Sequence, residues 1–284
     1  MKTLVKRAID WDNLSPARRD WARKAGVIAE DAALAAGSLL GFSLTRLARI
    51  ANTKDFGGWG STAVYDRLFR PLRWRNLSML EIGVGGYDDN SGGKSLRLWR
   101  AFFPRARIAA LDLYDKTSLS RGRVQVFQGS QVDRAVLDTI ARNRGGFDIV
   151  IDDGSHINEH QIRSFEILFP HVKPGGLYVV EDTQTSYWEG FGGGAVGSAA
   201  HAKCCVSYFK GLVDGLNHAE FPDAGYRPSR YDLEIVSIQF VHNLIIIEKG
   251  NNAGPSNIIG RWDAGIVRAS GKIDHAGKIT TTGR

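Results

Sequence analysis

Two hydrophobic patterns divide the chain. Over residues 1–75 the apolar positions recur at helical spacing, with interruptions near Gly37 and Gly41. From residue 78 onward, short apolar runs of strand length alternate with stretches of helical spacing. The pattern therefore predicts a helical N-terminal extension, followed by a domain in which strands and helices alternate.

The alternating part predicts a doubly wound α/β fold. Strands are expected at 78–83, 107–112, 123–127, 147–152 and 177–181. Helices are expected near 93–102, 131–143 and 158–169. Strands and helices that alternate at this spacing are typical of a parallel sheet with right-handed crossovers.

The C-terminal part is expected to close the sheet. One long helix is predicted over 197–216. Two adjacent apolar segments, 232–240 and 243–249, with a turn at Val241–His242, predict an antiparallel hairpin at the sheet edge. The tail that follows is rich in Gly, Asn and Thr and is expected to be loose.

The composition excludes several classes of protein. The chain has 284 residues, 43% hydrophobic and 24% charged, which is typical of a folded globular protein and unlike a disordered or fibrous one. We expect neither a membrane span nor a secretory signal, because no apolar run reaches the roughly 20 residues that a bilayer needs. Cys204 and Cys205 are adjacent and provide no disulfide framework, which favours a reducing, cytoplasmic location.

The charge is unevenly distributed along the chain. Residues 1–75 carry 14 Lys or Arg against 7 Asp or Glu, whereas residues 76–249 carry 18 against 21. Basic ends can attract nucleic acid, an anionic membrane surface or an acidic partner. The simpler interpretation is that these charges lie on solvated helix faces.

A glycine-rich turn follows the first predicted strand, in the run Glu81-Ile-Gly83-Val-Gly85-Gly86-Tyr87-Asp88-Asp89. Such a turn lies at the crevice where nucleotides bind in doubly wound sheets. A dinucleotide fingerprint has a third glycine where this chain has Asp88. The carboxylates of Asp88 and Asp89 would repel a pyrophosphate. S-adenosylmethionine (SAM), which carries a sulfonium and an ammonium and no phosphate, therefore fits better than NAD.

Two further strand ends add candidate cofactor contacts. Asp112 ends the second predicted strand, where an acidic residue can bind both ribose hydroxyls. The third strand leads into Ser130 and Gln131, whose small polar groups could meet the adenine edge. Each residue alone could be an ordinary polar group of a loop, but their order along the sheet favours a nucleoside site.

Paired acids end the fourth and fifth predicted strands. Asp152 and Asp153 follow one apolar run, and Glu181 and Asp182 follow the other. Because the carboxyl ends of neighbouring parallel strands meet at one edge of a sheet, these four carboxylates should converge. Such a cluster needs a cation or shifted pKa values. Oxygen ligands suit Mg²⁺ or Mn²⁺, so we predict a metal site.

One histidine stands out from the other six. His156 lies three residues after Asp153, at the predicted functional edge of the sheet. A histidine with a pKa near neutrality can act as a general base. We therefore take His156 as the candidate base and the other histidines as structural.

Over residues 52–250 the chain resembles a known family. It is similar to the metal-dependent class I SAM-dependent sugar O-methyltransferases of macrolide biosynthesis, the macrocin and mycinamicin type, and more distantly to the cephalosporin hydroxylase and rhamnosyl methyltransferase family. The matching runs are Leu80–Asp89, Ser91–Leu96, Phe147–His156, Pro174–Tyr178, Glu181–Asp182, Thr185–Trp188, His242–Asn243 and Glu248–Gly250.

The resemblance implies a seven-stranded, Rossmann-like methyltransferase sheet with the antiparallel hairpin. It implies that Asp153, Glu181 and Asp182 hold Mg²⁺, and that His156, with Asp153, carries the catalysis. The residues assigned to the SAM site are Glu81, Gly83, Gly85, Tyr87, Ser95, Asp112, Ser130, Gln131 and Asp152. Tyr187 and Trp188 are assigned to the substrate.

The resulting hypothesis is a SAM- and Mg²⁺-dependent O-methyltransferase of secondary metabolism. It would act on a sugar hydroxyl of a glycosylated natural product, a glycolipid or an oligosaccharide. Metal coordination would lower the high pKa of the hydroxyl, and His156 would take its proton. The alternatives are a phenol or catechol O-methyltransferase and, with less support, a nucleic-acid methyltransferase or binding module.

These interpretations divide the chain into three parts. Residues 1–75 are a helical extension, in which 52–75, with Tyr65, could serve as a lid over the acceptor. Residues 76–250 are the methyltransferase domain, and 251–284 are a loose tail. The expected partners are small-molecule or glycan substrates and no nucleic acid, with peripheral membrane contact through the basic N-terminus and a homo-oligomer as further expectations.

Overall fold

The computed structural model describes residues 15–53, 61–87, 92–221, 223 and 225–256, together with the short strands β8 (Lys272–Ile273) and β9 (Ile279–Thr280). Asp88 and Asp89, the glycine-rich loop upstream of residue 61 and most of the tail lie outside these residues. Within the described part, no helix is long and apolar enough to cross a bilayer.

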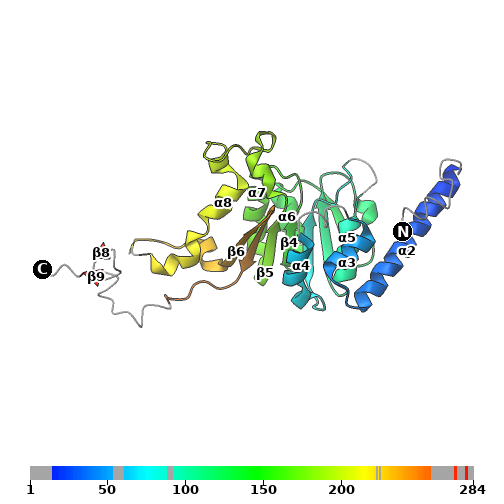
Figure 1. The fold of residues 1–284 in the computed structure, drawn as a ribbon, viewed down its shortest axis with the longest axis horizontal. Helices are drawn as coiled ribbons and strands as arrows, with labels where there is room; N and C mark the ends of the chain where they lie inside the picture. The colour runs from blue at the N-terminus through cyan, green and yellow to red at the C-terminus, as the bar shows by residue number, and fades with distance from the viewer. Residues whose placement is uncertain are drawn as a thin grey trace.

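Seven strands form the central sheet, in the order β3-β2-β1-β4-β5-β7-β6 (Figure 1). The strands are β1 (Ser78–Ile82), β2 (Arg107–Asp112), β3 (Val124–Gln128), β4 (Phe147–Asp152), β5 (Val172–Val180), β6 (Ile235–Val241) and β7 (Leu244–Lys249). The first five pair in parallel, and β7 is antiparallel to both β5 and β6. The predicted sheet and its C-terminal hairpin are therefore confirmed.

Helices cover both faces of the sheet and bury two hydrophobic cores. The first core is formed with α3 (Leu44–Ala51), α4 (Ser61–Phe69) and α5 (Lys94–Phe102), and the second with α6 (Arg134–Arg144), α7 (Asn158–Leu168) and α8 (Cys205–Gly211). Successive strand residues enter opposite cores: in β4, Ile149 and Ile151 join the first core and Val150 joins the second. The same alternation decides toward which face of the sheet a polar side chain near a strand end is directed.

The long helix predicted over 197–216 is wrong. This stretch holds η7 (His201–Lys203), α8 and the start of η8 (Asp214–Glu220). Cys204 is extended, with ψ 166°, and the amide of Cys205 donates to Oδ1 of Asn158 at 2.8 Å. A buried side chain from α7 thus caps α8 at its start, and helical periodicity alone carries no trace of such a tertiary cap.

The N-terminal helix α2 (Pro16–Leu39) continues through Gly37, so the interruption predicted there is wrong. A Cβ at Gly37 would lie 2.9 Å from side-chain atoms of both Leu47 and Phe42. The glycine therefore permits close packing of α3 against a continuous helix. The predicted break at Gly41 is correct, because its φ of +71° begins the turn into α3.

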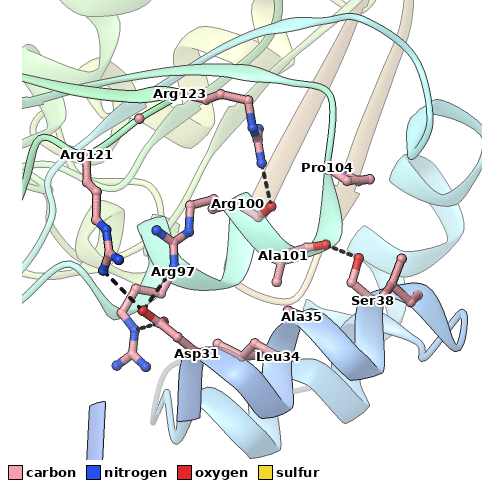
Figure 2. A pocket seen from close by; sticks show the side chains of 12 residues that line it. Asp31, Leu34, Ala35, Ser38, Arg97, Arg100, Ala101, Pro104, Arg121 and Arg123 are labelled. Carbon is pink, nitrogen blue, oxygen red and sulfur yellow. Dashed lines mark hydrogen bonds and ion pairs between the residues drawn. The ribbon is translucent and has the colours of Figure 1, made fainter. Parts of the chain in front are cut away.

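Ion pairs fasten α2 to α5, as Figure 2 shows. Asp31 of α2 lies 2.8 Å from Nε of Arg97 and 3.1 Å from a guanidinium nitrogen of Arg100. Arg121, in the segment before β3, lies 3.6 Å from the same carboxylate. These side chains line a groove of about 500 Å³ between the two helices. The guanidinium groups of Arg97, Arg100 and Arg121 face Asp31, and these contacts hold α2 against α5 and the segment before β3.

Candidate active site

The glycine-rich turn after β1 lies directly against the turn after β4. Gly83 has φ +84°, and a Cβ there would lie 2.1 Å from the carbonyl oxygen of Asp153. Any side chain at this position would push the two turns apart. Gly85 has φ +72°, and no atom of the residues that the structure describes lies within 4 Å of its Cβ position, so its backbone borders space open to a ligand. The turn therefore presents bare backbone next to the acidic residues of β4.

Asp112 holds the glycine-rich turn in place. Its Oδ2 accepts from the amide of Val84 and its Oδ1 from the amide of Tyr114, each at 2.9 Å. Lys116, almost fully buried, donates to the carbonyl of Gly86 at 3.2 Å and places a positive charge beside the turn. Sequence reasoning missed Lys116, because a lone lysine in a loop has no distinguishing spacing.

Glu81 is a buried carboxyl group between β1 and α5. It accepts from the indole Nε1 of Trp99 at 2.9 Å and from Oγ of Ser95 at 3.1 Å. Burial raises the pKa of Glu81 to about 8, an effect that these two hydrogen bonds oppose and the charge of Glu181 reinforces. Glu81 and Ser95, both predicted to line the cofactor, thus contact each other.

Asp152 and Gln131 meet on the opposite face of the sheet. The amide of Gln131 donates to Asp152 at 3.0 Å and accepts from the backbone of Ser155 at 2.7 Å. Ser164 and Tyr178 also donate to Asp152, which is fully buried. Burial raises the pKa of Asp152 to about 6, against the effect of these hydrogen bonds. Both residues thereby brace the turn after β4.

The other two predicted cofactor residues lie near the surface. Tyr87 is 81% exposed and has a φ of +40°. Ser130 is partly exposed, and its Oγ accepts from the amide of Val132 at 3.3 Å.

Three residues form a compact cluster at the carboxyl ends of β4 and β5. Nε2 of His156 lies 3.4 Å from Oδ2 of Asp182 and 4.0 Å from Oδ1 of Asp153. One ligand atom from each of the three residues lies within 4.8 Å of the others. Two carboxylates and an imidazole in this arrangement could hold a divalent cation or share a proton.

The backbone is strained at two of these three residues. His156 has φ +57° and Asp182 has φ +52°, in the left-handed region that costs non-glycine residues of order 1–3 kcal/mol. The conformation is retained because surrounding hydrogen bonds define both turns: Oγ of Ser155 bonds Nδ1 of His160 at 2.9 Å, and Thr185 donates to the carbonyl of Asp182 at 3.2 Å. Such strain is concentrated at functional sites.

The His156 imidazole is suited to accept a proton. Burial lowers its pKa below the ordinary value, and the negative charge of Asp182 partly offsets this. The ring is therefore neutral at neutral pH. Its Nδ1 is buried and has no hydrogen-bond partner within the described part of the chain. A buried polar atom without a partner, beside two carboxylates, fits a site that a ligand completes.

Comparison with known proteins identifies relatives of this chain. No protein-family model matches the chain. Mycinamicin VI 2''-O-methyltransferase of Micromonospora griseorubida is 49% identical over 193 residues, 67% of this chain and 48% of that enzyme. Demethylmacrocin O-methyltransferase of Streptomyces fradiae is 46% identical over 222 residues, 75% of this chain and 56% of that enzyme. The chain thus spans about half the length of the curated relatives it matches.

A solved structure agrees with these relatives. The MycE methyltransferase from the mycinamycin biosynthetic pathway, in complex with Mg and SAH, superposes with a TM-score of 0.73 at 45% identity, over 80% of this chain and 60% of that one. The matched domain is homologous to these sugar O-methyltransferases. The resemblance drawn from the sequence and the class I methyltransferase fold are therefore confirmed.

In this sugar O-methyltransferase homologue, Glu181 lies beside the cluster but has a partner of its own. The hydroxyl of Tyr65, in α4, donates to Oε1 of Glu181 at 2.5 Å. Tyr65 is fully buried, and burial, followed by the charges of Glu181 and Asp153, raises its pKa well above the ordinary value. The phenol is thus a permanent donor. Sequence analysis placed Tyr65 in a lid and did not connect it with Glu181, because 116 residues separate them.

Tyr187 and Trp188 follow the cluster in the chain. They lie at the end of η5 (Thr183–Tyr187) and just after it, and their side chains are 45% and 51% exposed. Tyr187 stacks on the imidazole of His201 with ring centroids 5.6 Å apart, which orients its ring. Two exposed aromatic rings therefore follow Asp182 by only five and six residues.

Proposed function

We propose that the chain is a SAM- and Mg²⁺-dependent O-methyltransferase that acts on a sugar hydroxyl of a glycosylated natural product. The observation that carries the proposal is the cluster of Asp153, His156 and Asp182, held next to the glycine-rich turn in a domain homologous to sugar O-methyltransferases. A phosphate-free, cationic cofactor suits this acidic edge of the sheet.

The glycine-rich turn would receive SAM. The open space at Gly85 lets a ligand approach the backbone closely. Of the predicted cofactor residues, Gly83, Gly85, Tyr87 and Ser130 border the turn or the surface. Asp112, Glu81, Ser95, Gln131 and Asp152 are already hydrogen-bonded within the protein. In our proposal this second group shapes the SAM site, and Asp112 retains capacity for a ribose hydroxyl, since each carboxylate oxygen has two lone pairs.

The metal would be held by Asp153, Glu181 and Asp182, whose hard oxygen donors match Mg²⁺ or Mn²⁺. Bound there, the ion would supply Lewis-acid polarisation of the sugar hydroxyl. His156 would accept the hydroxyl proton, because its lowered pKa leaves it neutral. Asp182, 3.4 Å from Nε2, would stabilise the resulting imidazolium.

The substrate class follows from the relatives together with two exposed rings. The mycinamicin, demethylmacrocin and rhamnosyl tetracenomycin enzymes are named for glycosylated natural products. Tyr187 and Trp188 offer faces on which a sugar ring or an apolar aglycone could pack. We accordingly propose a small-molecule acceptor and no nucleic acid.

Several expectations from the sequence remain predictions. They are the three-part division of the chain, the lid over 52–75, the cytoplasmic location, the homo-oligomer and the membrane contact of the basic N-terminus.

Methyl transfer from labelled SAM tests the proposal. Acceptors would be glycosylated macrolides and rhamnosylated polyketides, with the matching aglycones and a catechol as controls. We expect transfer to glycosylated acceptors only, its loss with EDTA, and its return with Mg²⁺. Transfer to the catechol alone would support the phenol alternative, and full activity in EDTA would contradict the metal role.

A further inference from the structure

The N-terminal extension reaches into the proposed metal site through one side chain. Tyr65 lies on α4, outside the alternating α/β domain, and its hydroxyl is 2.5 Å from Oε1 of Glu181. A hydroxyl-to-carboxyl distance this short is typical of a strong hydrogen bond. Asp153 acts electrostatically on the same phenol, so the contact lies beside the metal cluster.

The ring of Tyr65 has little freedom to move. It stacks on Phe69 with centroids 5.0 Å apart and meets Trp99 edge-on at 5.8 Å. Trp99 in turn donates to Glu81. The packed aromatic rings of α4 and α5 therefore supply the hydrogen-bond donors to both Glu181 and Glu81. Packing fixes the position of each donor.

We propose that Tyr65 is a positioning residue, which holds the Glu181 carboxylate in the orientation required for metal binding. The inference rests on the proposed function, since it needs Glu181 to be a metal ligand. The hydrogen bond engages one lone pair of Oε1, and a carboxylate has further lone pairs with which it could bind an ion. The N-terminal extension thus completes the site that the α/β domain begins.

Tyr65→Phe tests this directly, because it removes the hydroxyl and keeps the ring packing. Mn²⁺ would serve as the probe, with its free concentration followed by its paramagnetic resonance signal in the absence of acceptor. We expect Tyr65→Phe to weaken Mn²⁺ binding roughly 10–100-fold, the usual effect of losing a partner behind a ligand. Excess Mg²⁺ should restore methyl transfer, which a general folding defect would not allow.

Tyr226→Phe is the matched control. Its hydroxyl also bonds a carboxylate, Oδ2 of Asp232, at 2.7 Å, outside the cluster. It should leave Mn²⁺ binding unchanged. In a Glu181→Gln background, Tyr65→Phe should have no further effect, because the hydroxyl acts through Glu181.

The outcomes separate the two proposals. Wild-type Mn²⁺ affinity in Tyr65→Phe, or an equal loss in Tyr226→Phe, would overturn the role of Tyr65 and leave the metal site standing. No Mn²⁺ binding by the wild-type protein would overturn the proposed metal site itself. Undiminished binding by Glu181→Gln would remove Glu181 from the ligand set, and the inference with it.

Discussion

Asp152 and Asp153 are consecutive in the chain but occupy opposite environments. Asp152 ends β4 on the α7 face, fully buried and surrounded by the donors of Gln131, Ser164 and Tyr178. Asp153 lies beyond the strand with a side chain 33% exposed, near His156. Strand alternation sends neighbouring residues to opposite faces. A pair of acids at a strand end therefore supplies one structural anchor and one candidate ligand.

The largest effect is expected in the partly exposed cluster of Asp153, His156 and Asp182. His156→Gln removes the proposed base, so kcat should fall roughly 10²–10⁴-fold. The change lies in a strained, partly exposed turn, so the free energy of unfolding should change little. Steady-state kinetics with saturating SAM and Mg²⁺ would measure the effect. A near-normal kcat would place the base elsewhere.

The buried anchor should respond in the opposite way. Asp152→Ala leaves the donors of Gln131 and Ser164 without an acceptor, and should lower the free energy of unfolding by about 2–4 kcal/mol. Mn²⁺ affinity of the folded protein should be unchanged. Urea unfolding would measure the loss. A stable variant that fails to bind SAM would instead mean that Asp152 contacts the cofactor, as the sequence suggested.

A second buried carboxyl group, that of Glu81, should make the free energy of unfolding depend on pH. The pKa of Glu81 is about 8 when folded, above its ordinary value of 4.5, so the folded protein binds the extra proton. Stability from this group is complete below about pH 4.5 and is lost as the pH rises through 8. Glu81→Gln should remove this decline in the free energy of unfolding of the ligand-free protein.

Denaturant titrations at a series of pH values would check this, with the exposed Glu159→Gln as control. Glu159→Gln should retain the decline. Parallel curves for wild type and Glu81→Gln would show that Glu81 ionises normally.

The smallest effect is expected at the exposed ring of Trp188. Trp188→Ala should raise KM for the acceptor a few-fold, about 1 kcal/mol, because an exposed ring contributes packing without chemistry. Mn²⁺ binding and kcat should be unaffected. Trp74, which is similarly exposed at 49%, offers the control Trp74→Ala. Equal effects of the two changes would dissociate Trp188 from acceptor binding.

Local patterns were sufficient for the sheet and for part of the cluster. Short apolar runs of strand length predicted all seven strands. The acids at the ends of β4 and β5 predicted that Asp152, Asp153, Glu181 and Asp182 converge, and of these Asp153 and Asp182 meet in the cluster. Both follow from backbone geometry that repeats in every parallel sheet. The placement of His156 beside them followed from its short distance along the chain.

Tertiary contacts decided the features that the hydrophobic periodicity does not predict. The start of α8 depends on Asn158, and the continuity of α2 through Gly37 depends on the packing of Leu47. The division between Asp152 and Asp153, and the reach of Tyr65 to Glu181, arise from burial on particular faces. These contacts join residues far apart in sequence, so the amino acids alone determined the fold and the acidic edge, and only packing determined which acids remain open to a ligand.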